Sequence, residues 1–205
     1  MNAPVRHAVS ADYVFDGTAL HRHAAVVIEG NRIAYIVGRG DIDGLPLRTL
    51  PEEIWLAPGF VDVQVNGGGD VLFNEAPTAK TISTIAAAHR KFGTTGFLVT
   101  LITDAPEKTP RAIAAVQEAM QTEPSLLGLH LEGPFISPEK VGVHNRSFIR
   151  MPTDADLQTL AAWRDGVLLI TLAPERVRAG FIARLLSRGV RVSLGHSMAT
   201  YDEAR

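Results

Sequence analysis

The stretch that decides the fold is Gly128-Leu129-His130-Leu131-Glu132-Gly133-Pro134-Phe135, an apolar run that ends in a carboxylate and then breaks at Gly-Pro. The apolar run over residues 126–131 predicts a buried strand of a parallel sheet. A carboxylate at the exit of such a strand is costly unless it meets a cation or hydrogen-bond donors. Because the carboxyl ends of parallel strands form the functional face of α/β barrels, Glu132 is the first candidate site residue.

A second apolar stretch ends in the same way on a histidine. The sequence Val190-Arg191-Val192-Ser193-Leu194-Gly195-His196-Ser197 predicts a strand over residues 190–194 that leads into His196. A carboxylate and an imidazole at the ends of two parallel strands suit a metal ion in a hydrolase barrel. The residues alone leave other roles open. Glu132 could accept backbone N–H groups, and His196 could bond a carbonyl group where a helix begins.

Strands and helices alternate from residue 57 onward. Further strands are predicted at residues 60–65, 96–101 and 167–172. Helices are predicted over residues 78–92, from a cap at Thr109 with Pro110 in first position, after Thr153, and along the stripe Val177, Phe181 and Leu185. This alternation predicts an α/β protein with a parallel sheet and right-handed crossovers. We expect a partial TIM-like (β/α) barrel with about five strand–helix units present.

The last residues of the chain indicate that the predicted barrel is incomplete. Five units do not close a barrel that needs eight strands. Thr200 and Glu203 fit a capping box that opens a helix, and the chain stops at Arg205. We therefore expect a chain truncated to the N-terminal half of a longer protein. An open doubly wound domain with a frayed tail is the alternative.

The first 55 residues follow a different pattern. Two apolar runs at residues 24–28 and 32–37 flank Glu29-Gly30-Asn31 and predict a β-hairpin, and residues 38–51 read as a loop. We expect residues 1–55 to form the N-terminal part of a small β-sandwich subdomain. Residues 56–205 are expected to form the N-terminal portion of a metal-dependent barrel.

The composition excludes several classes of protein and site. The net charge of −2 gives no reason to expect nucleic acid or an acidic membrane as a partner. The chain has no cysteine, so a metal ion would have to use His, Asp, Glu and water. Residues 1–12 lack the pattern of a secretory signal, and no apolar run approaches the ~20 residues of a membrane span. We expect a cytoplasmic protein.

Several motifs, in order, carry a family resemblance. Residues 56–67 resemble the first barrel strand of the amidohydrolase superfamily, with Gln64-Val65-Asn66 where many members have His-x-His. The chain also contains His130-Leu131-Glu132-Gly133-Pro134, Val141-Gly142-Val143-His144-Asn145, Thr171-Leu172-Ala173-Pro174-Glu175 and Leu194-Gly195-His196-Ser197. From about Val26 to its end, the chain resembles the N-acetylglucosamine-6-phosphate deacetylase family. Each motif alone is weak, but the set is specific.

The resemblance implies a site with one divalent metal ion, zinc in the first place and iron or another ion as alternatives. Glu132 and His196 are implied as ligands, with Gln64 and Asn66 close to the metal. Neutral amides bind divalent ions less well than imidazoles do, which favours one metal over two. His144 and the backbone at Val143 are implied to contact the substrate. Val141 stands where the family usually has a basic residue, which leaves the outer contact of this loop open.

The resemblance also implies a reaction. It is the hydrolysis of the N-acetyl group of N-acetylglucosamine 6-phosphate to glucosamine 6-phosphate and acetate, by a homodimer when the protein is full length. A third ligand, the general-base Asp and the phosphate-binding residues are expected beyond Arg205, so no catalytic residue is assigned within the chain and the chain alone is expected to be inactive. Alternatives are another amidohydrolase, acting on a different amino sugar or a cyclic amide, and a non-catalytic short form. No catalytic role is assigned to His7, His21, His23, His89 or His130.

Overall fold

The computed structural model describes residues 5–178 and 180–205, which belong to two compact units. One unit ends at Gly59, and the other spans Phe60–Arg205. Two expectations fall partly outside the described residues. The expectation that residues 1–12 carry no secretory signal involves residues 1–4, and the helical stripe that starts at Val177 crosses position 179. None of the described helices has the length and apolar content needed to cross a membrane.

The first unit is built on a five-stranded sheet. Strands β1 (Arg6–Phe15), β2 (Leu20–Glu29), β3 (Arg32–Gly38) and β4 (Leu47–Thr49) follow the order β3-β2-β1-β4, and β5 (Trp55–Leu56) also pairs with β1. The predicted hairpin is confirmed as β2 and β3, with Gly30 at φ 62° in the turn. The prediction of a loop over residues 38–51 was wrong in part, because these residues contain β4, which pairs in parallel with β1.

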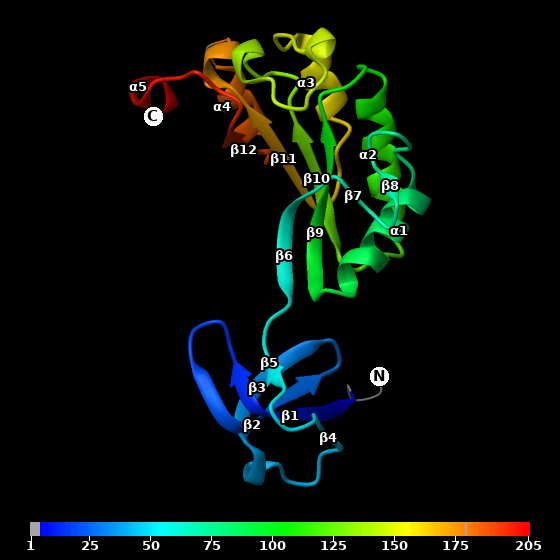
Figure 1. Ribbon diagram of the computed structural model, residues 1–205, viewed down its shortest axis with the longest axis vertical. Helices are drawn as coiled ribbons and strands as arrows, with labels where there is room; N and C mark the ends of the chain where they lie inside the picture. Colours follow the sequence, from blue (N-terminus) through cyan, green and yellow to red (C-terminus); the bar gives the residue numbers. More distant parts are fainter. Residues whose placement is uncertain (1–4, 179) are drawn as a thin grey trace. The chain divides into compact units, whose positions relative to one another are not determined.

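The second unit contains a parallel five-stranded sheet (Figure 1). Its strands are β6 (Phe60–Val65), β9 (Thr94–Ile102), β10 (Leu126–Glu132), β11 (Val167–Leu172) and β12 (Arg191–Leu194), in the order β12-β11-β10-β9-β6. All neighbouring pairs run parallel. The sheet and its connecting helices confirm the predicted α/β class and the partial TIM-like barrel. A short hairpin, β7 (Gly67–Gly68) and β8 (Val71–Leu72), follows β6 and was not predicted.

Helices connect consecutive strands of this sheet. They are α1 (Ala79–Arg90), α2 (Lys108–Ala119), α3 (Asp154–Leu160) and α4 (Phe181–Leu186), and α5 (Tyr201–Ala204) lies at the end of the chain. The capping box at Thr200 is confirmed. The prediction that Thr109 caps α2 was wrong, since the helix begins at Lys108 after Glu107. Pro110 still lies in the first turn, where its missing N–H is harmless.

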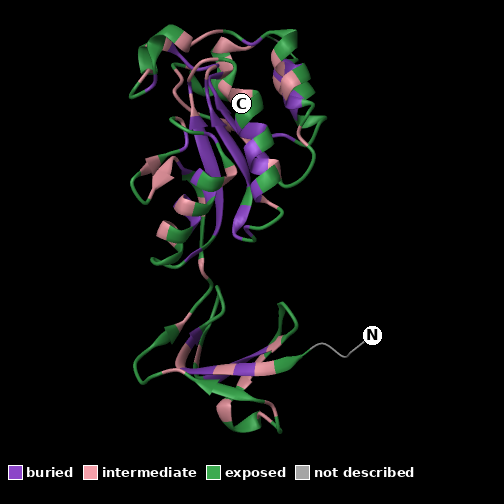
Figure 2. Cartoon of the chain, turned by 90° about the vertical axis from the view of Figure 1, so that its right-hand side faces the viewer, coloured by how far each residue is buried: buried purple, intermediate pink, exposed green. Residues whose placement is uncertain are grey.

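The core of the second unit lies between the sheet and the helices, and Figure 2 shows buried residues concentrated along the central strands. Side chains alternate along β10. Leu131 points to a cavity that α2 and α3 also line, whereas Glu132 points to a different cavity with Gln64 and His196. The same strand therefore supplies one face to the core and the other to the candidate site.

Candidate metal centre

Three side chains converge at the carboxyl ends of the strands. Glu132 is the last residue of β10, His144 lies in the loop that follows, and His196 comes two residues after β12. Glu132 Oε1 lies 2.9 Å from His196 Nε2 and 3.8 Å from His144 Nε2. One potential ligand atom from each of the three residues lies within 4.8 Å of the others. These are distances at which two or three groups can share one metal ion.

The backbone of His196 is held in an unusual conformation, with φ 51°. A non-glycine residue adopts a positive φ only where its surroundings stabilise it. The loop after β10 provides two such contacts. Ser137 N donates to His196 O at 2.8 Å, and His196 Nδ1 lies 2.7 Å from the carbonyl oxygen of Lys140. The loop between β10 and α3 therefore holds the imidazole by its Nδ1 edge.

The contact with Lys140 decides what His196 offers to Glu132. A carbonyl oxygen can only accept, so Nδ1 must carry the hydrogen. In the neutral ring Nε2 then directs its lone pair at Glu132 Oε1, only 2.9 Å away. Two lone-pair atoms this close require a cation between them, either a proton on the imidazole or a metal ion. A carbonyl behind the distal nitrogen is the usual support of a metal-bound histidine, so the pair fits a divalent ion.

His144 is oriented in the opposite way. The backbone N–H of Thr103, which can only donate, lies 3.3 Å from His144 Nδ1, and the Thr103 hydroxyl oxygen lies 2.8 Å from the same nitrogen. Nδ1 is therefore an acceptor, and the hydrogen of the neutral ring is on Nε2. This Nε2–H faces the cavity that contains Glu132. In this arrangement His144 is a hydrogen-bond donor to the cavity, whereas His196 is a lone-pair donor.

Gln64 contacts the second oxygen of the carboxylate. Its Nε2 donates to Glu132 Oε2 at 2.9 Å, which leaves Oε1 for the two histidines. Asn66 lines the same cavity, which has a volume of about 330 Å³. The cavity is lined by Gln64, Asn66, Leu72, Asn74, Ile102, Glu132, Val143, His144 and His196. All the residues singled out from the sequence as metal-binding, metal-proximal or substrate-binding thus lie around one space.

The surroundings keep Glu132 ionised. Glu132 is 8% exposed. The imidazole of His144 has the largest effect and lowers the pKa of Glu132, burial raises it, and His196 lowers it further, leaving a pKa of about 2. At neutral pH the side chain is a carboxylate, the form that binds a metal ion.

The histidines without an assigned role lie elsewhere. His130 points to the same side of β10 as Glu132, two residues earlier, and is 2% exposed. Its ring bridges Thr171 Oγ1 at 2.8 Å and Thr100 Oγ1 at 3.2 Å, and burial lowers its pKa. His89 Nε2 bonds Gly67 O at 2.9 Å and so fastens the β7–β8 hairpin to α1. The remaining three, His7, His21 and His23, belong to the first unit.

The sequence analysis missed two residues at the site. Thr103 follows β9 and bonds His144, and Asn74 bonds the backbone of Ile102 through both its side-chain oxygen and its nitrogen, each within 3.1 Å. For Thr103 a signal exists, because Thr103-Asp104 ends an apolar strand just as Glu132 does. For Asn74 the sequence carries no such signal, since it lies in an irregular turn before α1.

Comparison with known proteins places the chain in a family, although no protein-family model matches it. It is 33% identical over 186 residues to N-acetylglucosamine-6-phosphate deacetylase of Haemophilus influenzae, a match that covers 90% of the chain and 49% of the relative. It is 43% identical to the human protein of that name, over 70% of the chain and 37% of the relative. The crystal structure of N-acetylglucosamine-6-phosphate deacetylase from Pasteurella multocida superposes with a TM-score of 0.90 at 35% identity, over 97% of the chain and 53% of that structure.

The chain belongs to the N-acetylglucosamine-6-phosphate deacetylase family. It spans about half the length, or less, of the curated relatives it matches. One relative carries a different sugar in its name: N-acetylgalactosamine-6-phosphate deacetylase of a Shewanella strain is 45% identical over 70% of the chain and 37% of the relative. A deacetylase from Mycobacterium smegmatis, solved in complex with N-acetyl-D-glucosamine-6-phosphate, matches 97% of the chain and 51% of that structure with a TM-score of 0.79 at 29% identity.

Proposed function

We propose that the protein to which this chain belongs hydrolyses the N-acetyl group of N-acetylglucosamine 6-phosphate and releases glucosamine 6-phosphate and acetate. One observation carries the proposal: a carboxylate, a lone-pair imidazole and an N–H imidazole face one cavity at the carboxyl ends of parallel strands. The names of the relatives support the substrate class, and a related structure contains this sugar phosphate. Cytoplasmic location and a homodimer belong to the same proposal.

Glu132 and His196 would hold one divalent metal ion, with zinc as the first choice. When bound, such an ion lowers the pKa of a bound water molecule and polarises a carbonyl oxygen. Gln64 and Asn66 present amides in place of imidazoles, which supports a single ion. Because the Gln64 amide already occupies Glu132 Oε2, Glu132 would bind through Oε1.

His144 would act on the substrate itself. Its Nε2–H is directed into the cavity and would donate a hydrogen bond to the acetyl carbonyl oxygen, where negative charge develops during hydrolysis. Val143 is an exposed residue that lines the same cavity, and its backbone would lie beside the same group. The general base that moves the proton from water to the leaving amine is assigned to an Asp outside this chain, as the family resemblance implies.

Metal binding by the 205-residue chain tests the site. Calorimetric titration with zinc at neutral pH is expected to give one equivalent, and Glu132→Gln is expected to weaken binding at least about 100-fold because a charged ligand is lost. Glu118→Gln, which removes an exposed carboxylate from α2, should leave the affinity unchanged. Two tight equivalents, or equal affinities for both variants, would contradict the proposed centre.

A chimera tests the reaction. The chain would be joined to the remaining segment of the Pasteurella multocida relative, and acetate release would be measured with N-acetylglucosamine 6-phosphate. We expect turnover that is reduced by orders of magnitude in His196→Asn and in His144→Gln. A chimera that binds zinc but releases no acetate from any amino-sugar phosphate would contradict the proposal.

The galactosamine-named relative supports a second candidate substrate, N-acetylgalactosamine 6-phosphate. The two sugars share the acetamide and the phosphate and differ in the orientation of one hydroxyl group. The same chimera, assayed with both sugars in parallel, separates the candidates through the ratio of their kcat/KM values.

A further inference from the structure

Thr103 connects three segments that meet at the site. It is the first residue after β9, is 3% exposed, and bonds His144 through both its backbone N–H and its hydroxyl oxygen. Its hydroxyl also lies 3.3 Å from the carbonyl oxygen of Glu132. A single buried side chain thus contacts the end of β10 and the loop that carries His144.

We propose that Thr103 is a positioning residue, which holds the His144 ring by Nδ1 and so presents Nε2–H to the substrate oxygen. The identity of that oxygen rests on the proposed function, but the orientation of the ring does not. The backbone N–H of Thr103 has a fixed direction, so Nδ1 is an acceptor however the hydroxyl rotates. The hydroxyl has one hydrogen for two acceptors, and the shorter contact, 2.8 Å to Nδ1 against 3.3 Å to the Glu132 carbonyl oxygen, makes it the second donor to Nδ1.

Gly133 makes room for this arrangement. A Cβ placed on Gly133 would lie 2.2 Å from Thr103 Oγ1, far inside van der Waals contact. The hydroxyl therefore occupies the volume that a side chain at position 133 would fill. This contact explains why a glycine follows Glu132: the neighbouring strand needs that space to reach the histidine.

The test uses ¹⁵N NMR of the histidine rings in the complete 205-residue chain, without metal and with zinc. His144→Gln identifies the signals of His144 among those of the seven histidines. In the wild type we expect Nδ1 at the shift of an unprotonated ring nitrogen and a hydrogen on Nε2. Thr103→Val keeps the shape and the backbone donor but removes the hydroxyl, and it should raise the population of the other tautomer about fivefold, the equivalent of one hydrogen bond. Thr103→Ser should restore the wild-type spectrum.

Matched controls make the outcomes decisive. Thr100→Val removes the hydroxyl that faces His130, so it should move the signals of His130 and leave those of His144 unchanged. A wild-type spectrum with the hydrogen on Nδ1 overturns the proposal, even if the Thr103→Val chain does not fold. A folded Thr103→Val chain with unchanged His144 signals overturns it too.

A second readout separates this inference from the proposed function. In the chimera, Thr103→Val should lower kcat about tenfold while the zinc affinity stays at the wild-type value. If the ring signals behave as expected and no amino-sugar phosphate is turned over, the positioning role holds and the proposed reaction fails. If turnover is normal and the ring signals do not respond to Thr103, the reaction holds and the positioning role fails.

Discussion

Gly133 combines a left-handed backbone with a crowded position. Its φ is 84°, and a Cβ would clash with Thr103 Oγ1. Gly189 has a similar φ of 77°, but no atom lies within 4 Å of its Cβ position. We expect Gly189→Ala to lower the free energy of unfolding by about 1 kcal/mol through backbone strain alone, and Gly133→Ala by about 3 kcal/mol or more through strain and overlap. Urea unfolding of both variants measures the difference. Equal losses in the free energy of unfolding would show that the Thr103 side chain can move away from the new Cβ without loss of stability.

Gln64 contacts the candidate metal centre through Glu132. Its amide is the donor that fixes Glu132 Oε2, and Gln64→Leu leaves that oxygen without a partner. We expect zinc affinity to fall about tenfold with the stoichiometry unchanged, as for other residues that support a ligand from behind. Competition with a chelator measures the affinity. Gln121→Leu, at an exposed position, is the control. An equal loss of zinc affinity in this variant would show that Gln64 has no specific role in supporting Glu132.

The sequence predicted Glu132 and His196 as site residues because each lies at the end of an apolar run. Glu132 and His196 each end an apolar run, so their shared place at the sheet edge followed from strand alternation with helices. The roles assigned to them remain predictions. The contact between Thr103 and His144 could not be predicted from the sequence. The two residues are 41 positions apart, and the loop after β10 brings His144 back to the end of β9. The opposite ring orientations of His144 and His196 likewise depend on the backbone groups behind them.

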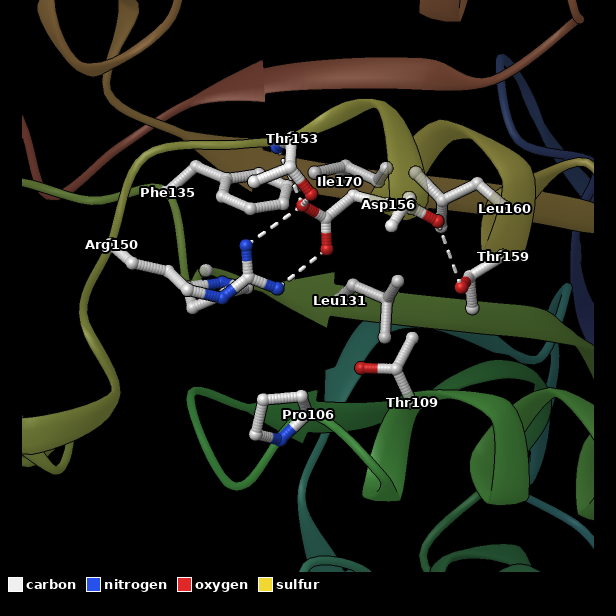
Figure 3. A pocket seen from close by; sticks show the side chains of 13 residues that line it. Pro106, Thr109, Leu131, Phe135, Arg150, Thr153, Asp156, Thr159, Leu160 and Ile170 are labelled. Atoms are coloured by element: carbon white, nitrogen blue, oxygen red, sulfur yellow. Dashed lines mark hydrogen bonds and ion pairs between the residues drawn. The ribbon is translucent and has the colours of Figure 1, made fainter.

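At the scale of elements, Asp156 ties the first turn of α3 to the loop that precedes it. This side chain accepts hydrogen bonds from Arg150 Nη1 at 2.8 Å and Nη2 at 2.5 Å and from Thr153 N at 2.7 Å (Figure 3). Arg150 also lies over the ring of Phe135, 5.4 Å from its centroid. These groups line a cavity of about 360 Å³ whose apolar walls include Leu131 and Ile170. The ion pair between Arg150 and Asp156 thus fixes the end of the loop that carries His144, just before α3 begins.

Asp156 gives this fastening a pH dependence. Burial raises its pKa, but the bonds from Arg150 and Thr153 outweigh burial and leave the pKa below the ordinary value of 3.8. A depressed carboxyl pKa adds stability above the unfolded value, and this stability is lost as the pH falls from about 3.8 through the folded pKa. We expect Asp156→Asn to cost about 2 kcal/mol at pH 7 and progressively less below pH 4.

Thermal unfolding of the wild type and of Asp156→Asn, measured between pH 7 and pH 3, tests this pH dependence. Asp154→Asn is the matched control, because the Asp154 side chain is 82% exposed and its ion pair with Arg184 lies at the surface. Such pairs add little to stability, so this variant should track the wild type at every pH. A constant offset for Asp156→Asn across the whole range would mean that charge has no part in its role.

The elements themselves were predictable to different degrees. The five parallel strands each contain apolar residues and were predicted within a few residues of their ends, although β12 (RVSL) is short and β6 (FVDVQV) is partly polar. Strand β1 has small and polar residues among its buried positions, such as Ala8, Ser10 and Ala11, so no apolar run marks it. The hairpin of β7 and β8 has only two residues in each strand. The start of α2 was misplaced because Thr109 and Pro110 together resemble a cap, while Lys108 already lies inside the helix.

At the scale of the whole molecule, we expect the 205-residue chain alone to release no acetate. It contributes Glu132, His196 and His144, whereas the family resemblance assigns the third ligand and the general base to further strands. The measurement is acetate release from N-acetylglucosamine 6-phosphate by the purified chain with zinc, beside the Pasteurella multocida relative as the positive control. Comparable turnover would show that the chain completes its site with other residues, His130 among them. The division into a β-sandwich part over residues 1–55 and a barrel part over residues 56–205 likewise remains a prediction.

The strands of the parallel sheet lie side by side in the order in which they occur along the chain, from β6 through β9, β10 and β11 to β12. During translation each strand therefore leaves the ribosome when its partner is already present. No strand has to wait for a later segment to be inserted between two earlier ones. The sheet can grow by addition at one edge at the pace of synthesis, with each αβ unit covering the apolar face of the preceding strand as it emerges. The polypeptide can thus assemble the walls of the candidate metal centre in sequence, and His196 is the last of the three converging side chains to be synthesised.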